Sequence, residues 1–213
     1  MIDNGKSLLF VHIPKCAGTF IEKNLTPKID WHEKGEKHFS LQRCIDVYGE
    51  LRVRDCFRFA VIRNPFSRLL SFYLYHQRKR TDLFSINPIE KYARAFRREY
   101  YRKFSDFVFN LMHYSHKLKT WAKNDILPCH QFLISHQGIG VELLLRQENL
   151  SSDLEILTKR TGLAFVNKHI NASPSHYKLT DYYGETEINF VLDFYRADFF
   201  HYYPGHQCSD PTT

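Results

Sequence analysis

The chain has 213 residues, 43% of them hydrophobic and 25% charged, a composition typical of a globular protein with one substantial core. Its five cysteines are odd in number and show no CxxC spacing, which argues against a disulfide framework or a zinc site. No apolar stretch approaches the 18 residues needed to span a bilayer, and no signal-peptide pattern precedes the first strand. We therefore expect a cytoplasmic protein, or a domain excised from a longer one.

The first third of the chain alternates between strand-like and helix-like segments. Apolar runs predict strands over residues 7–12 and 56–62. Helices are expected over 18–26, over 40–49 with Ser40 as N-cap, and from Asn64-Pro65 to about 79.

The remaining chain is predicted to be mostly helical. Helices are expected over 88–101, 105–122, 152–161 and 180–199, the third opened by a capping box from Ser152 to Glu155. Loops are expected over 124–130 and 167–177, and a strand-like apolar run is expected over 141–145. From Pro204 onward we expect a loose tail.

This alternation predicts an α/β fold with a central parallel sheet flanked by helices, as one domain over 1–203 with a tail over 204–213. In such sheets, ligands bind beyond the carboxyl ends of the strands. Lys15 and Arg63 both follow strand ends, so we expect them to converge although about 50 residues separate them.

The turn after the first strand carries the residue types of an anion site. Backbone N–H groups at a helix start attract anions, Gly18 permits close approach, Thr19 adds a hydroxyl and Lys15 a positive charge. The lysine precedes the glycine, which excludes the Walker A order G-x-x-x-x-G-K-[ST]. An ordinary strand-to-helix turn is the alternative interpretation.

The turn after the second strand supplies a second anion-binding set. Arg63 stands at the strand end, and Ser71 lies about two turns along the following helix. A guanidinium can bind a phosphate in bidentate fashion while the hydroxyl takes another oxygen. Arg68 lies on the same helix, where a structural ion pair or a surface charge is the alternative to ligand binding.

Together these residues resemble the sulfotransferase superfamily, whose members use the sulfate donor 3′-phosphoadenylyl sulfate. The first turn resembles the family's 5′-phosphosulfate loop, and Arg63 with Ser71 resembles its 3′-phosphate motif. The segments 146–150 and 169–173 and an aromatic C-terminal helix resemble the carbohydrate branch, related to Golgi and bacterial polysaccharide sulfotransferases.

The resemblance implies a P-loop NTPase-like three-layer fold and a metal-free transfer of the sulfuryl group to an acceptor hydroxyl. Lys15 would be catalytic by stabilising the charge on the oxygen between sulfur and phosphorus. Phe20 stands where the family usually has a second hydroxyl. The residues expected to bind the donor are Pro14, Lys15, Cys16, Ala17, Gly18, Thr19, Phe20, Arg63 and Ser71.

The acceptor hydroxyl needs a base, and histidine is the usual one near neutral pH. His38 is the first candidate, because related glycan sulfotransferases place a catalytic histidine comparably. His12 is interpreted as structural, while His130 and Gln131 could contact the acceptor or supply the base. Glu148 is interpreted as a structural carboxylate that balances Arg63 or Arg146.

The net charge of +7 is concentrated between Arg78 and Lys103, a segment with nine lysines and arginines and only three acidic residues. A solvated helical face is one interpretation. The other is a surface for an anionic glycan acceptor, with Arg97 and Arg98 among its contacts. Asn171 and Ser173 lie in a polar loop that could close over the nucleotide.

Three other functions remain open. A P-loop kinase would need a Walker lysine and a magnesium carboxylate, and neither pattern is present. A nucleic-acid or polyanion-binding protein would fit the mixture of arginines and aromatics over 92–103 but would not need Lys15, Arg63 and Ser71. A non-catalytic relative that only binds nucleotide would keep all three.

Overall fold

The computed structural model describes residues 2–3, 7–25, 37–79, 83–84, 103–165 and 177–205. The expected helix over 88–101, residues 169–173, Arg97, Arg98 and most of the tail lie outside these ranges. The chain divides into two units, the first made of Met1–Asn64 and Cys129–Ala172, the second of Pro65–Pro128 and Ser173–Thr213. The single domain over 1–203 stays a prediction.

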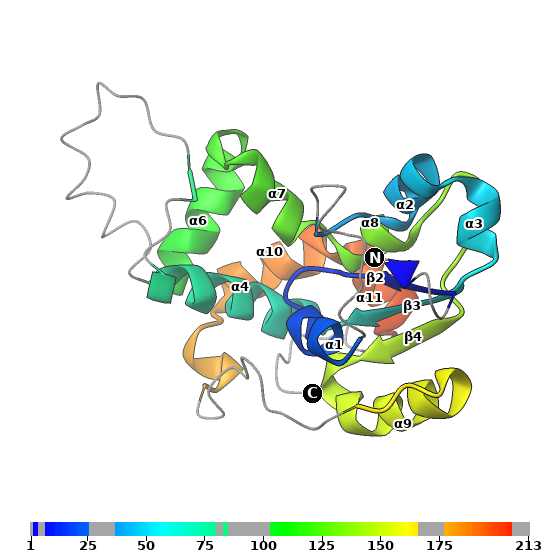
Figure 1. Cartoon of the computed structure of the whole chain (residues 1–213). Coiled ribbons are helices and arrows are strands. Elements are labelled where there is room, and N and C mark those ends of the chain that lie inside the picture. Colours follow the sequence, from blue (N-terminus) through cyan, green and yellow to red (C-terminus); the bar gives the residue numbers. More distant parts are fainter. Residues whose placement is uncertain are drawn as a thin grey trace. The chain divides into compact units, whose positions relative to one another are not determined.

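The first unit is built on a four-stranded sheet in the order β1-β2-β3-β4 (Figure 1). The strands are β1 (Ile2–Asp3), β2 (Leu8–Val11), β3 (Phe57–Ile62) and β4 (Leu143–Arg146). β2, β3 and β4 are parallel, and β1 joins β2 as an antiparallel edge. The predicted parallel sheet is therefore confirmed.

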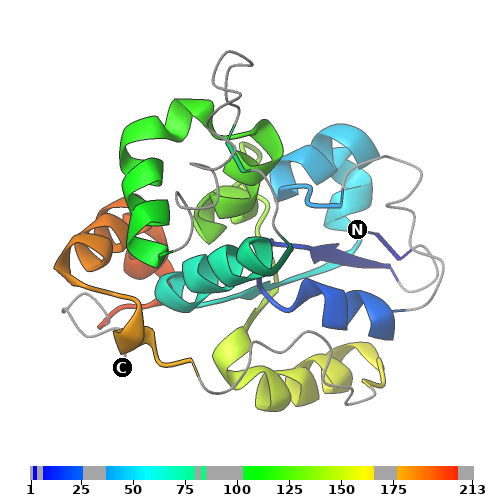
Figure 2. The same cartoon turned by 90° about the vertical axis from the view of Figure 1, so that its left-hand side faces the viewer.

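Burial explains why these apolar runs form parallel strands. The side chains of β2 and of 59–62 in β3 are all buried, as expected for strands covered on both faces. In the described part of this unit, five helices pack around them. Figures 1 and 2 show α2, α3 and α8 on one side of the strands and α1 and α9 on the other. Their bounds are α1 Gly18–Asn24, α2 Leu41–Tyr48, α3 Glu50–Arg54, α8 Cys129–Leu133 and α9 Leu150–Thr161, with the 3₁₀ turn η4 at Gln147–Asn149.

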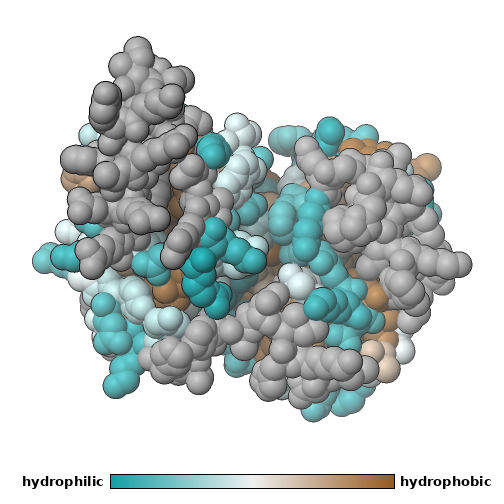
Figure 3. All heavy atoms as spheres, turned by 60° about the vertical axis from the view of Figure 1, so that its left-hand side comes forward, coloured by the Kyte–Doolittle hydropathy of each residue, from teal (hydrophilic) through white to brown (hydrophobic). Residues whose placement is uncertain are grey.

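The second unit is mostly helical in its described residues. Its elements are α4 Pro65–Lys79, α6 Phe104–Tyr114, η3 Ser115–Lys117, α7 Thr120–Ile126, η5 Leu179–Asp181, α10 Glu185–Phe194 and α11 Arg196–Tyr202. No helix in the described part of the chain is long and apolar enough to cross a membrane. On the face in Figure 3, the described residues are mostly hydrophilic, with apolar residues visible in small areas between them.

Arg68 has a structural role in the second unit. Its side chain is only 2% exposed, and its guanidinium donates to the carbonyl oxygens of Leu127 at 2.7 Å and Asp125 at 2.9 Å. The hydroxyl of Tyr195 donates to the carbonyl of Ile126 at 2.8 Å. Together they satisfy carbonyl groups that the end of α7 leaves without helical partners. Arg68 is thus not a surface charge.

Several predicted boundaries are confirmed. Ser40 caps α2, its hydroxyl accepting from the N–H of Arg43 at 3.2 Å. The helix predicted from Asn64-Pro65 to residue 79 is α4.

Three other predictions are wrong. The helix over 105–122 is interrupted, because Leu118 is extended in a bridge with Phe84. The loop over 124–130 is the end of α7 followed by α8, with Pro128 directly before α8, where its fixed φ suits a helix start. The helix over 180–199 divides into η5, α10 and α11, with Gly184 and Tyr195 as N-caps of the last two.

The predicted capping box at Ser152 is also wrong. α9 begins two residues earlier, at Leu150, and the hydroxyl of Ser152 donates to the carbonyl of Asn149. The carboxylate of Asp153 accepts from the N–H of Arg146 at 2.6 Å. This bond ties the end of β4 to the first turn of α9.

Candidate active site

The turn between β2 and α1 has an unusual backbone. Lys15 and Ala17 have φ angles of 66° and 55°, in the left-handed region that non-glycine residues seldom adopt. Each such residue costs on the order of 1–3 kcal/mol and persists only where its surroundings enforce it. Ile13 and Cys16 are fully buried and anchor the turn on both sides of Lys15. A backbone with left-handed residues at every second position can turn its N–H groups toward a single anion.

His12 explains why a glycine stands at position 18. A Cβ atom on Gly18 would lie 1.8–2.5 Å from three atoms of the His12 ring. Gly18 has no positive φ, so the glycine is needed here for space rather than for backbone conformation. His12 is 3% exposed, which leaves its ring little room to move. The ring therefore fixes where α1 begins.

Glu22 and Lys37 hold His12 in place. The Glu22 carboxylate lies 2.7 Å from Nδ1 of His12 and 2.8 Å from Nζ of Lys37. Burial alone would raise the pKa of Glu22, but its bonds with His12 and Lys37 outweigh burial and lower that pKa. Burial also lowers the pKa of His12, so a neutral His12 ring lies with Nδ1 against the ionised Glu22.

Sequence reasoning missed Glu22 although a signal was present. Glu22 lies four residues after Gly18 on α1, which places both on the same face of the helix. Lys37 gave no such signal, because it lies outside α1 and 15 positions after Glu22.

His38 lies against His12 at 4.4 Å between ring centroids, with the ring planes at 75°. Its Nδ1 is 3.0 Å from the carbonyl oxygen of His12. A carbonyl can only accept, so Nδ1 carries the proton and Nε2 carries the lone pair. Burial is the main cause that lowers the pKa of His38 to about 4, followed by the repulsion that a protonated His12 would exert. His38 is therefore neutral at pH 7, in the form that can accept a proton.

The ends of the three parallel strands are linked to one another. The guanidinium of Arg63, just after β3, donates to the carbonyl oxygen of Lys15 at 3.4 Å. The N–H of Asn64 donates to the carboxylate of Glu148, in η4 after β4, at 2.6 Å. The two predicted turns therefore meet, and Glu148 has a structural role through Asn64.

The other predicted site residues are distributed over both units. His130 and Gln131 lie on α8 in the first unit, half-buried and exposed respectively. Ser71 is half-buried on α4 in the second unit. Within the described ranges, His, Cys, Asp and Glu side chains nowhere gather in threes that could hold a metal ion.

The lowered pKa values of His12 and His38 predict how stability depends on pH. His12 and His38 both have lowered pKa values when folded, so the unfolded chain binds protons more readily. The free energy of unfolding should therefore fall as pH drops from about 6.5 toward 4. Urea unfolding at pH 7 and pH 5 measures this loss. His38→Gln should reduce it, whereas His113→Gln, at an exposed histidine, should not; equal losses in both variants would contradict the burial of His38.

Comparison with known proteins identifies the family. No curated protein and no solved structure matches the chain. The model of the Sulfotransferase family matches residues 1–203, nearly the whole chain. A sheet of parallel strands flanked by helices, with Lys15 and Arg63 meeting at its carboxyl end, agrees with that match. The chain therefore belongs to the sulfotransferase family, whose members transfer sulfuryl groups.

Proposed function

We propose that the protein transfers the sulfuryl group of 3′-phosphoadenylyl sulfate to a hydroxyl group of a carbohydrate. The observation that carries this proposal is the strained turn at Lys15, linked to Arg63 through the Lys15 carbonyl oxygen. The turn offers backbone N–H groups and an ammonium, and the neighbouring strand end offers a guanidinium. A donor with a 5′-phosphosulfate and a separate 3′-phosphate matches two such neighbouring anion-binding groups.

Each donor-binding residue has its own role in this proposal. Residues 14–20 surround the 5′-phosphosulfate, with Lys15 beside the oxygen that bridges phosphorus and sulfur. Arg63 and Ser71 bind the 3′-phosphate. The assembly of His12, Glu22 and Lys37 keeps the start of α1 in register with the turn. No metal ion takes part in the proposed transfer.

His38 is the proposed base. Its Nδ1 proton is committed to the His12 carbonyl, which leaves Nε2 to accept the proton of the acceptor hydroxyl. The acceptor oxygen attacks sulfur in line while the bond between sulfur and the bridging oxygen breaks. The electron pair of that bond leaves on the 3′-phosphoadenosine 5′-phosphate, where Lys15 stabilises the charge. His130, Gln131, Arg97 and Arg98 are proposed contacts of the acceptor.

Comparing two histidine variants tests the base. His38→Ala should lower turnover at saturating donor by about a hundredfold or more, the usual contribution of a positioned base. His130→Ala should change turnover much less and should act mainly on the KM of the acceptor. Loss of turnover in His130→Ala alone would mean that the base is His130.

Transfer of label tests the reaction itself. The protein is incubated with ³⁵S-labelled 3′-phosphoadenylyl sulfate and a panel of glycans without magnesium, and sulfated glycan is measured. A parallel reaction contains γ-labelled ATP with magnesium. Label from the sulfate donor alone is the expected result. Label from ATP alone would replace the proposal with a kinase.

A further inference from the structure

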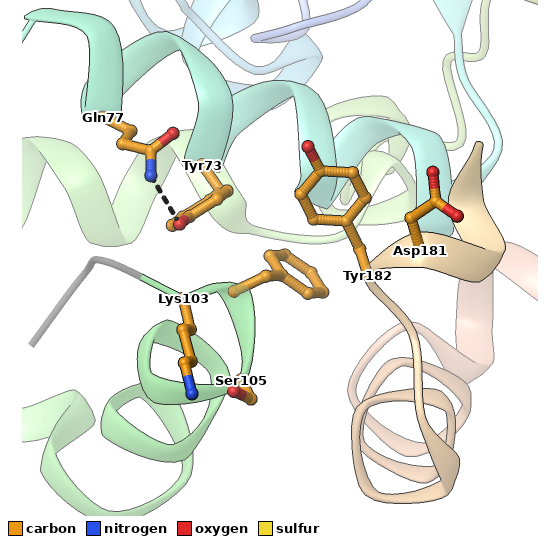
Figure 4. A pocket seen from close by; sticks show the side chains of 7 residues that line it. Tyr73, Gln77, Lys103, Ser105, Asp181 and Tyr182 are labelled. Carbon is orange, nitrogen blue, oxygen red and sulfur yellow. Dashed lines mark hydrogen bonds between the residues drawn. The ribbon is translucent and has the colours of Figure 1, made fainter. Parts of the chain in front are cut away.

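The second unit contains a hollow of about 350 Å³ (Figure 4). Its volume falls within the range of small-molecule sites, roughly 300–1,000 Å³. Three segments that are distant in sequence contribute to it, namely α4, the start of α6, and η5 with the residue that follows. The lining residues are Tyr73, Gln77, Lys103, Phe104, Ser105, Asp181 and Tyr182.

Aromatic rings supply the apolar part of the hollow. Tyr73 is 2% and Phe104 is 3% exposed, and their rings meet edge to face with centroids 5.3 Å apart. The ring of Tyr182 stands at 87° to that of Phe104, with centroids 6.1 Å apart. Tyr182 is half-buried, so part of its ring remains accessible. The first two rings are fixed by burial, and the third gives a surface against which a flat apolar face can pack.

Polar groups surround these rings. The amide of Gln77 donates to the Tyr73 hydroxyl at 2.8 Å. Figure 4 shows Lys103 and Ser105 on one side of the hollow and Asp181 on the other. All three are exposed, and they combine an ammonium, a hydroxyl and a carboxylate. Groups that donate and groups that accept hydrogen bonds therefore border the same aromatic surface.

We propose that this hollow binds one pyranose ring of the carbohydrate acceptor. A pyranose has an apolar C–H face that can pack on the ring of Tyr182, and hydroxyls on its edge that both donate and accept. Asp181 would accept from these hydroxyls, and Lys103 would donate to them. The ammonium of Lys103 also favours a sugar that carries a carboxylate on that side. The identification of the bound sugar as the acceptor rests on the proposed function. The binding of a sugar in the hollow does not depend on that function.

Saturation-transfer NMR on the full chain, without nucleotide, tests the subsite. The probes are methyl β-D-glucopyranoside and the corresponding glucuronide. Both should receive saturation, the glucuronide should bind more tightly, and Tyr182→Ala should weaken both at least fivefold. Tyr114→Ala is the matched control, because Tyr114 is an exposed tyrosine at the far end of α6. Lys103→Gln should remove the preference for glucuronide, whereas Lys117→Gln should keep it.

Two results would overturn the subsite: neither sugar binds the wild type, or Tyr182→Ala binds both sugars as the wild type does. Thermal stabilisation by 3′-phosphoadenosine 5′-phosphate, measured on the same samples, separates this failure from that of the proposed function. Stabilisation by the nucleotide without sugar binding rejects the subsite alone. Sugar binding that depends on Tyr182, without stabilisation by the nucleotide, supports the subsite and rejects the proposed donor.

Discussion

Replacing Lys15 with alanine is expected to lower turnover by about a hundredfold or more while the fold survives. A positioned group that stabilises the charge of a transition state typically contributes about 2.7–4 kcal/mol. The half-buried Lys15 lies in the strained turn that Arg63 contacts. A lysine on the water-exposed surface elsewhere cannot place its charge in this turn. Alanine keeps the Cβ atom, so the strain of the left-handed φ at position 15 changes little.

Lys23→Ala is the matched control, because Lys23 is an exposed lysine in the last turn of α1. Steady-state turnover with saturating donor should be nearly unchanged in this variant. Circular dichroism and urea unfolding should show that both variants are folded. Turnover in Lys15→Ala within a few-fold of the wild type would contradict the proposed role of the ammonium.

Replacing Gly18 with alanine is expected to destabilise the protein by about 1–3 kcal/mol, the usual cost of overpacking a filled site. The added methyl group would overlap the His12 ring, which Glu22 contacts at Nδ1. Either the ring or the start of α1 must then move, so binding of the nucleotide should weaken as well. Urea unfolding measures the first effect and calorimetric titration with 3′-phosphoadenosine 5′-phosphate the second.

Gly140→Ala is the control for this substitution, because a Cβ atom at Gly140 would meet nothing within 4 Å and the residue has no positive φ. A double variant, Gly18→Ala with His12→Ala, should lose less stability than the sum of the two single losses, since removal of the ring leaves room for the methyl group. Strict additivity would show that the two positions do not collide.

Local patterns in the sequence were sufficient to predict the core of the fold and the meeting of the two turns. Apolar runs before Lys15 and Arg63 predicted parallel strands, and parallel strands end at the same edge of a sheet. The distance between Arg63 and the Lys15 carbonyl confirms that the two turns meet. Ser40 was predictable as a cap because capping depends on a residue only three positions away.

The features that escaped prediction depend on contacts between distant segments. Leu118 leaves the helical pattern because it pairs with Phe84, and nothing near Leu118 in the sequence announces this. His12 was interpreted as structural, but Lys37, which pairs with its partner Glu22, comes 25 positions after His12. The left-handed φ of Lys15 belongs to a residue type that normally avoids it, so only the folded surroundings reveal it.

The central claim is that the Lys15 and Arg63 turns bind the two phosphate groups of a 3′-phosphoadenylyl sulfate donor. Thermal unfolding with 3′-phosphoadenosine 5′-phosphate, with AMP and with ATP-magnesium tests it most directly. At a hundred times its Kd, a ligand of the folded state adds about 2.7 kcal/mol, which for a chain of this size raises Tm by roughly 5–10 °C. At equal concentrations, we expect the largest shift with 3′-phosphoadenosine 5′-phosphate and a much smaller one with AMP, which lacks the 3′-phosphate. A larger shift with ATP-magnesium, or equal shifts with AMP and 3′-phosphoadenosine 5′-phosphate, would contradict the claim.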